Sequence, residues 1–389
     1  MPFGVLTMAE HRAFLVEEIK NGVRSISELC RKHGVSRPTA YKWLGRSGHG
    51  ESMESRSRAP LRSPGKTSHP VEAAILEARK RHPCWGGRKL KAYLERRGER
   101  GIPSAKTVTA ILRRNGMVSG AASEAAAHWK RFEALSPNNL WQADFKGHFA
   151  MEDGSRCHPL TVTDDMSRFS LCISAKENER LPGVRDSFLS LFREYGLPEM
   201  VLCDNGPPWG TTGVFGYTRF EALLMGYGIL PIHGKPLHPQ TQGKEERFHR
   251  TLKDELLRRV SMKDLLHAQK EFDAFRRAYN EERPHCSLGY AVPADRYRKS
   301  ARAMPEKIEE WEYPEGCAVK RVRGNGYIRF RNCDLFLSEA FYGLSVALAE
   351  AREDGFADII YRNFRIATVD LRNGGFVSKK ITKLKKNCK

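Results

Sequence analysis

The stretch from residue 140 to residue 257 constrains the fold most, because its hydrophobic pattern changes repeatedly between the period of a strand and that of a helix. Three strands are predicted first, with a turn at Asp153-Gly154 between the first two. Helices and strands then alternate. In chain order the eight segments are 140–149, 159–163, 169–175, 184–195, 200–203, 217–227, 229–232 and 242–257. The predicted order is therefore βββαβαβα, a central α/β domain.

Three acidic residues occupy defined places in this order. Asp144 lies on the first strand, Asp204 directly follows the fourth, and Glu246 lies on the last helix. A ribonuclease-H-like sheet of this order would bring the three carboxylates together. Carboxylates suit Mg²⁺ or Mn²⁺, and two such ions can stabilise both oxygens of an in-line phosphodiester displacement. Taken singly, Asp144 can also be an exposed strand residue, and Asp204-Asn205-Gly206 an ordinary turn.

Four motifs in order resemble the integrase-core transposases, a family that includes bacterial insertion-sequence transposases and is related to retroviral integrases. They are Trp141-Gln-Ala-Asp144, Cys203-Asp-Asn-Gly206, His238-Pro-Gln-Thr-Gln-Gly-Lys-Glu-Glu-Arg-Phe-His-Arg-Thr-Leu-Lys253 and Tyr279-Asn-Glu-Glu-Arg-Pro-His285. The resemblance covers about residues 135–300. It implies a ribonuclease-H-like fold in which Asp144, Asp204 and Glu246 are catalytic and hold two Mg²⁺ or Mn²⁺ ions. It also implies that Lys253 meets DNA near the scissile phosphate.

Two features depart from the family pattern. The gap between Asp204 and Glu246 leaves 41 residues, longer than usual, and we assign the excess to a surface-loop insertion around Trp209 to Thr218. Glu245 stands where relatives usually carry an apolar residue, so two neighbouring glutamates compete for the third position. At about 100° per residue, Glu245 falls on the apolar stripe of the helix and Glu246 at its edge. We therefore assign Glu246 to the metal site.

The amino-terminal residues predict a helix-turn-helix unit. Residues 8–22 have helical spacing, and residues 25–44 follow as helix, turn and helix, with Ser27 and Ser36 as caps and Pro38 in the first turn of the last helix. The predicted core is Leu29, Val35, Tyr41 and Leu44. The residues left free to contact a DNA major groove are Arg37, Thr39, Lys42 and Arg46. Any small three-helix unit with a basic face would look similar.

The rest of the chain divides by composition. Residues 86–94 and 104–116 predict a second helix-turn-helix, and short strands beyond residue 316, including those around Asn325-Gly326, predict a small barrel-like all-β domain. That domain can bind the DNA backbone or brace an oligomer. The predicted divisions are 1–47 (helix-turn-helix), 48–70 (basic flexible linker), 71–117 (second helix-turn-helix), 118–136 (connector), 137–300 (catalytic core), 301–378 (β domain) and 379–389 (basic tail).

The net charge of +20 indicates a polyanionic partner, with nucleic acid first and a membrane surface second. No stretch approaches about 18 uninterrupted apolar residues, and the amino terminus lacks a signal-peptide pattern, so we expect a cytoplasmic protein, nucleoid-associated if bacterial, without a membrane partner. The nine scattered cysteines contain no C-x-x-C pair and suggest neither disulfides nor a zinc finger.

These features predict a metal-dependent DNA transposase, a polynucleotidyl transferase that binds the terminal inverted repeats of a mobile element. It would nick the ends to free 3′ hydroxyls and join them to target DNA. Its partner would be double-stranded DNA, both element ends and target, and joining two ends requires a homo-oligomer assembled on DNA. The alternatives are a catalytically inactive DNA-binding protein derived from a transposase, and a structure-directed nuclease of the same fold that cuts without joining.

Overall fold

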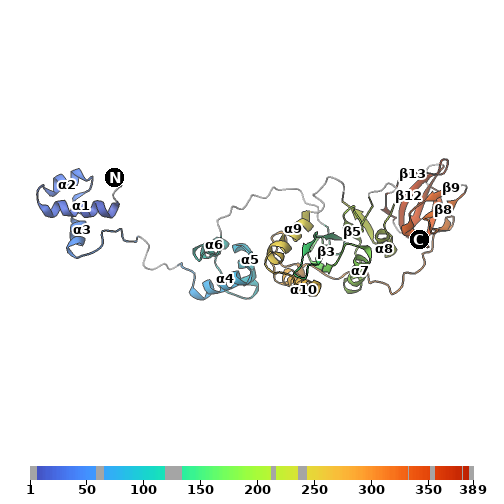
Figure 1. The fold of residues 1–389 in the computed structure, drawn as a ribbon, viewed down its shortest axis with the longest axis horizontal. Coiled ribbons are helices and arrows are strands. Elements are labelled where there is room, and N and C mark those ends of the chain that lie inside the picture. Colours follow the sequence, from blue (N-terminus) through green and yellow to red (C-terminus); the bar gives the residue numbers. More distant parts are fainter. Residues whose placement is uncertain are drawn as a thin grey trace. The chain divides into compact units, whose positions relative to one another are not determined.

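The computed structural model describes residues 7–57, 65–118, 134–211, 216–234, 243–331, 333–350, 355–378 and 380–384 (Figure 1). The chain divides into two compact units, Met1–Lys66 and Thr67–Lys389. The eight cysteines in the described ranges are all free. Within those ranges no helix is long and apolar enough to span a membrane.

The first unit is a three-helix group made of α1 (Met8–Asn21), α2 (Ile26–Lys32) and α3 (Arg37–Gly48). Ser36 caps α3 as predicted, with its Oγ 3.4 Å from the amide nitrogen of Thr39, and Pro38 lies in the first turn. The predicted cap Ser27 is wrong, because Ser25 caps α2 and Ser27 lies inside that helix.

The core of this unit matches the predicted one only in part, because Val35 and Leu44 are half-buried. Leu29 is buried, but Tyr41 is 49% exposed because α3 turns Ala40 and Trp43 toward the other helices. Tyr41 therefore lies on the outer surface of the helix predicted to enter the DNA groove.

The second unit begins with another three-helix group, made of α4 (His69–Arg81), α5 (Gly87–Arg96) and α6 (Ala105–Arg114). Helix α4 begins two residues inside the predicted linker 48–70. Its core gathers Ile75, Leu90 and Ile111. Gly87 lets α5 approach α6 closely, since a Cβ there would lie 2.5 Å from the backbone oxygen of Ala105.

The central domain is a six-stranded mixed sheet with strand order β2-β3-β1-β5-β6 and β4 paired to β3. It follows the predicted βββαβαβα order, except that the first predicted strand is divided into β1 and β2. The strands are β1 (Leu140–Phe145), β2 (Phe149–Ala150), β3 (Arg156–Asp164), β4 (Ser170–Lys176), β5 (Met200–Cys203) and β6 (Leu230–His233).

Helices cover the sheet on both faces. One buried cluster gathers Trp141, Phe188 and Phe220, and another gathers Ile173, Phe248 and Phe272. The helices are α7 (Leu181–Tyr195), α8 (Arg219–Gly226), α9 (Gly243–Leu252), continued by a π-helical turn (Lys253–Leu257), and α10 (Leu265–Glu281). Burial on both faces holds the strand ends at one edge, where the predicted acids lie.

The carboxyl-terminal region is all β. One sheet has the order β13-β12-β11-β10-β7, with β14 on β12, and β8 pairs with β9 alone. The predicted strands on either side of Asn325-Gly326 thus belong to different sheets. No sheet is closed within the described residues, so the barrel-like closure stays a prediction. The strands are β7 (Ala318–Arg321), β8 (Tyr327–Phe330), β9 (Cys333–Phe336), β10 (Ser345–Glu350), β11 (Phe356–Tyr361), β12 (Phe364–Asp370), β13 (Gly375–Ser378) and β14 (Thr382–Lys383).

Some predicted segments fall wholly or partly outside the described residues. These are most of the connector 118–136, part of the linker 48–70, the first residues of the motif that begins at His238, and most of the basic tail 379–389.

Candidate active site

The ends of β1 and β5 bring the first two predicted acids to the same level of the sheet. These strands are parallel neighbours whose register pairs Trp141 with Val201 and Gln142 with Leu202. Continued by two residues, the same register places Asp144 level with Asp204. Two aspartates far apart in the chain therefore meet at one sheet edge.

The two carboxylates differ in environment. Burial raises the pKa of Asp144 to about 6, the amide of Phe145 opposes that rise by donating a hydrogen bond to Oδ1 at 2.8 Å, and the charge of Asp204 adds to it. Asp204 is exposed, and its Oδ1 accepts a hydrogen bond of 2.8 Å from the amide of Asn205. Each carboxylate keeps one oxygen free of these backbone bonds, and their charges oppose each other.

Helix α9 turns its two neighbouring glutamates in different directions. Glu245 is 1% exposed and accepts hydrogen bonds from the hydroxyls of Thr163 and Thr161 on β3, the latter at 3.4 Å. Burial raises its pKa to about 8. Glu246 is exposed. The inward orientation predicted for Glu245 is confirmed.

The inner face of α9 is nevertheless the one that approaches Asp144. His249 lies between the two acids, with its Nδ1 3.9 Å from Asp144 Oδ2 and its Nε2 3.8 Å from Glu245 Oε2. Burial lowers the pKa of His249 to about 3, so the imidazole is neutral there. Within the described residues no three His, Cys, Asp or Glu side chains lie close enough together to hold a metal ion. The convergence of Glu246 with the two aspartates stays a prediction.

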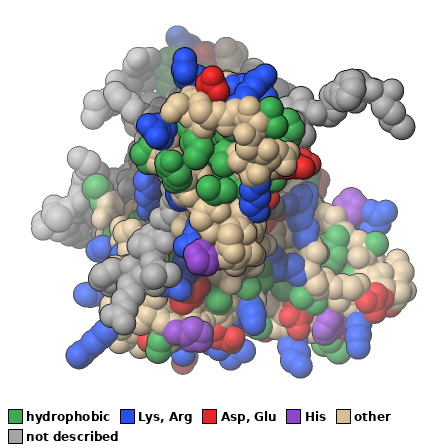
Figure 2. Space-filling model, turned by 90° about the vertical axis from the view of Figure 1, so that its left-hand side faces the viewer, with side chains coloured by type: hydrophobic (Ala, Val, Ile, Leu, Met, Phe, Trp, Pro, Cys, Tyr) green, Lys and Arg blue, Asp and Glu red, His purple; other side chains and the backbone are tan. Residues whose placement is uncertain are grey.

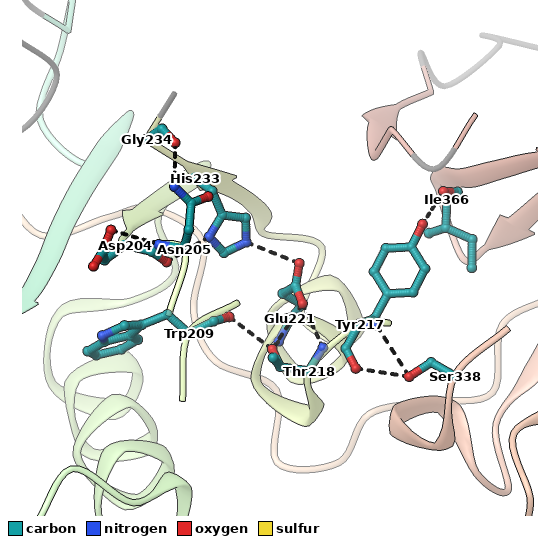
Figure 3. A network of polar contacts seen from close by, with 10 residues as sticks. All are labelled: Asp204, Asn205, Trp209, Tyr217, Thr218, Glu221, His233, Gly234, Ser338 and Ile366. Carbon is teal, nitrogen blue, oxygen red and sulfur yellow. Dashed lines mark hydrogen bonds and ion pairs between the residues drawn. The ribbon is translucent and has the colours of Figure 1, made fainter. Parts of the chain in front are cut away.

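A continuous set of hydrogen bonds surrounds the Asp204 end of the site (Figure 3). His233, the last residue of β6, lies between the backbone of Asp204 and the carboxylate of Glu221, with both distances 3.0 Å. Asn205 donates to the backbone oxygen of Gly234 at 2.7 Å. Sequence reasoning missed this group, because its members come from separate elements and show no local pattern.

Asp164 and Asp165 serve as structural anchors. Asp164 ends β3, Asp165 begins the turn that follows it, and both are 1% exposed. The carboxylate of Asp164 accepts hydrogen bonds from the amides of Asn138 and Ser167 at 2.7 and 2.8 Å. Asp165 forms an ion pair of 2.6 Å with Lys244, which ties the start of α9 to the sheet.

The predicted DNA-contact residues of α3 are not equally available. Arg37 and Lys42 are exposed, whereas the hydroxyl of Thr39 lies 2.8 Å from that of Ser36. Arg46 is committed within its own unit, because its guanidinium bonds Glu51 at 3.2 Å and stacks on Trp43 at 4.8 Å. Arg37 and Lys42 are thus the exposed cations predicted on α3, and the ammonium of Lys42 also lies over the Trp43 ring at 5.4 Å.

A second group of cations, missed by sequence reasoning, lies where α5 meets the central domain. Trp85 donates to Glu255 at 3.2 Å, and Arg283 donates to the same carboxylate at 3.0 Å. The pKa of Lys89 is lowered to about 8 by burial and then by the charge of Arg283. Arg247 adds to the same positive surroundings. In Figure 2 the Lys and Arg side chains lie singly or in small groups among side chains of the other types.

Comparisons with known proteins agree with this organisation. Two models described as integrase core domain match residues 134–239 and 227–293. A helix-turn-helix model matches residues 11–60, a homeodomain-like model residues 39–112, and the carboxyl-terminal domain of the IS481 family transposase residues 317–376.

Proteins of bacterial insertion elements are among the individual relatives. A 31.7 kDa protein of insertion element IS407 from Burkholderia multivorans is 27% identical over 265 residues, 65% of this chain and 92% of that protein. Transposase InsD of the IS2 elements of Escherichia coli is 27% identical over 233 residues, 56% of this chain and 75% of that protein. The catalytic core of HTLV-2 integrase, solved with magnesium, aligns to 43% of this chain and all of that core, with 19% identity and a TM-score of 0.33.

A mixed sheet of this order, with two aspartates level at its strand ends and helix-turn-helix units ahead of it in the chain, defines an integrase-type polynucleotidyl transferase fold. The integrase-core matches, the match to the carboxyl-terminal domain of the IS481 family transposase and the insertion-element relatives support the integrase-core transposases of insertion sequences as the family of this chain. Its helix-turn-helix and integrase regions indicate that it binds DNA.

Proposed function

We propose that this transposase binds the terminal inverted repeats of its element, nicks each end to free a 3′ hydroxyl, and joins that hydroxyl to a phosphate of target DNA. Asp144, Asp204 and Glu246 are the catalytic residues in this proposal. They hold two Mg²⁺ or Mn²⁺ ions per site.

The observation that carries the proposal is the level placement of Asp144 and Asp204 at the ends of neighbouring parallel strands. Their mutual charge helps to raise the pKa of Asp144 to about 6, after burial. Neighbouring carboxylates with free oxygens are the donor set that hard divalent cations prefer. The chemistry of these two residues therefore fits the implied metal.

Each of these residues has its own role in strand transfer. When bound, the metal ions supply charge stabilisation to the entering and leaving oxygens of the phosphodiester. Asp144 and Asp204 hold that charge at a fixed sheet edge, and Glu246 supplies a third carboxylate from the solvent face of α9. Lys253, seven residues further along the helix and exposed, holds the phosphate backbone beside the reacting bond.

DNA contacts extend beyond the catalytic domain in this proposal. Arg37 and Lys42 on α3 read the element end, and the cations Lys89 and Arg247 hold its backbone near α9. Joining two ends at one target requires at least a pair of protomers, so the working form is a homo-oligomer assembled on DNA.

The test is cleavage and joining of labelled DNA that carries the element ends, with Mg²⁺ or Mn²⁺ added. We expect wild-type protein to nick and join, and Asp204→Asn to bind the ends but do neither. Asp186→Asn is the matched control, because Asp186 is an exposed aspartate on α7, remote in sequence from the site. It should retain wild-type rates.

Two outcomes would replace the proposal. Tight binding of the ends without nicking under either metal would favour the catalytically inactive DNA-binding protein. Nicking without joining would favour a nuclease of the same fold.

A further inference from the structure

The side chain of His233 joins the Asp204 backbone to helix α8. Its Nδ1 lies 3.0 Å from the backbone oxygen of Asp204, and its Nε2 lies 3.0 Å from Oε1 of Glu221 (Figure 3). A carbonyl oxygen can only accept, so Nδ1 carries the proton and donates it to Asp204. The imidazole therefore bridges the loop that bears the second acid and a helix behind it.

Contacts on both sides hold the His233 ring in place. Glu221 is 5% exposed, and its Oε2 accepts from the amide of Thr218 at 2.6 Å. Gly210 lies against the other side of the ring, since a Cβ at that position would come within 2.9 Å of His233 Cε1. A ring held from both sides transmits any displacement of α8 to the Asp204 loop.

The carboxyl-terminal β domain holds the start of α8 in turn. The amide of Tyr217 donates to Ser338 Oγ at 3.3 Å, and the Ser338 hydroxyl donates back to the oxygen of Tyr217 at 2.9 Å. The Tyr217 hydroxyl donates to the backbone oxygen of Ile366. Tyr217, Ala222 and Met225 belong to the same buried cluster as the core of the β domain.

Asp204 needs such support because its own contacts are few. Its side chain is exposed, and the hydrogen bond recorded for its carboxylate comes from the next residue, Asn205. The direction of the carboxylate therefore depends on the backbone to which His233 and Asn205 are bonded. Groups that act on a phosphodiester tolerate little displacement.

We propose that His233 is a positioning residue for Asp204, and that the β domain anchors it through Ser338, Tyr217 and Glu221. This inference rests on the proposed catalytic role of Asp204. It gives the β domain a role other than DNA binding or bracing an oligomer: it stiffens one wall of the active site within its own chain.

Hydrogen exchange tests the mechanical link without any need for activity. Ser338→Ala removes both hydrogen bonds between Ser338 and Tyr217, and Tyr217→Phe removes the one to Ile366. Exchange of the amides in residues 204–210 should therefore rise about fivefold or more, since losing one ordinary hydrogen bond has an effect of about that size. Tyr342→Phe is the matched control, because Tyr342 is a 65% exposed tyrosine of the same domain. Unchanged exchange in both variants, with the melting temperature retained, would overturn the anchor.

Single-turnover nicking tests the consequence for Asp204. His233→Ala should slow nicking about tenfold or more, with DNA affinity unchanged, because positioning acts on the chemical step. His233→Asn should recover most of the rate, since its amide can take the place of Nδ1 and donate to the Asp204 oxygen. A wild-type rate in His233→Ala would overturn the positioning role. If wild-type protein itself fails to nick, the proposed function fails, whereas the exchange result still decides whether the anchor exists.

Discussion

The two faces of helix α9 place identical side chains in opposite surroundings. On the inner face, Glu245 is buried against the hydroxyls of Thr161 and Thr163, and His249 lies beside it. On the outer face, Glu246 and Lys253 are exposed. A rotation of about 100° separates neighbouring residues of a helix, which is enough to move a carboxylate from the interior to solvent.

This contrast separates two properties of a carboxylate: whether it lies close to Asp144, and whether its oxygens can bind a metal ion. Glu245 is linked to Asp144 through His249, but its oxygens already accept hydrogen bonds from threonine hydroxyls. Glu246 is exposed to solvent, and its convergence with the two aspartates stays a prediction. The choice between the two glutamates can therefore be decided by experiment.

Replacing Glu245 and Glu246 by glutamine, one at a time, should produce the largest of the expected effects on nicking. Glu246→Gln should lower nicking more than about a hundredfold, since even losing a group behind a metal ligand costs 10- to 100-fold. Glu245→Gln should keep most of the activity, because the amide oxygen can accept from one threonine hydroxyl and the amide NH2 can donate to the oxygen of the other. Single-turnover nicking with Mn²⁺ measures both. The reverse result would move the third acid to the inner face.

The buried glutamate should also make stability depend on pH. Burial raises its pKa from an ordinary value of 4.5 to about 8, so the folded protein holds a proton that the unfolded chain has released. The contribution of Glu245 to the free energy of unfolding should therefore fall as pH rises from about 5 to 8, by at most about 1.4 kcal/mol per pH unit. Urea denaturation in EDTA measures it.

Glu245→Gln is the matched variant for this measurement. It cannot titrate, so its stability should fall less than that of the wild type over the same range. Parallel curves for the two proteins would mean that Glu245 is ionised in the folded state, and would remove the distinction between the two faces.

Sequence patterns within one helix or strand predicted the features that depend on that element alone. The type of each strand and helix and the inward turn of Glu245 follow from periodicity within one segment, and the Ser36 cap follows from its residue type. The same reasoning failed at Tyr41, because which face of a short helix is buried depends on its neighbours as well as on its own sequence.

Contacts between distant elements were outside the reach of the sequence. The segment from Trp209 to Thr218 was predicted to be a surface insertion, yet Trp209 is buried in the sheet core and Tyr217 in that of the β domain. Their partners are far away in the chain, so no local period marks them. The bridge from His233 to Glu221 is of the same kind, because it joins β6 to α8 through tertiary packing.

The smallest expected effect concerns DNA binding by Lys253, on the outer face of the helix. Lys253→Gln should reduce the slope of log affinity against log salt by about one unit, as expected when one phosphate contact is lost. Arg258→Gln is the control, because Arg258 lies in the next helical turn and is paired with Asp254 at 2.6 Å. Fluorescence anisotropy with end-bearing DNA gives both slopes. Lys253 and Glu246 lie seven residues apart, on nearly the same side of the helix, so an unchanged slope would mean that this side is turned away from DNA. The case for Glu246 as the third acid would then weaken together with that for Lys253.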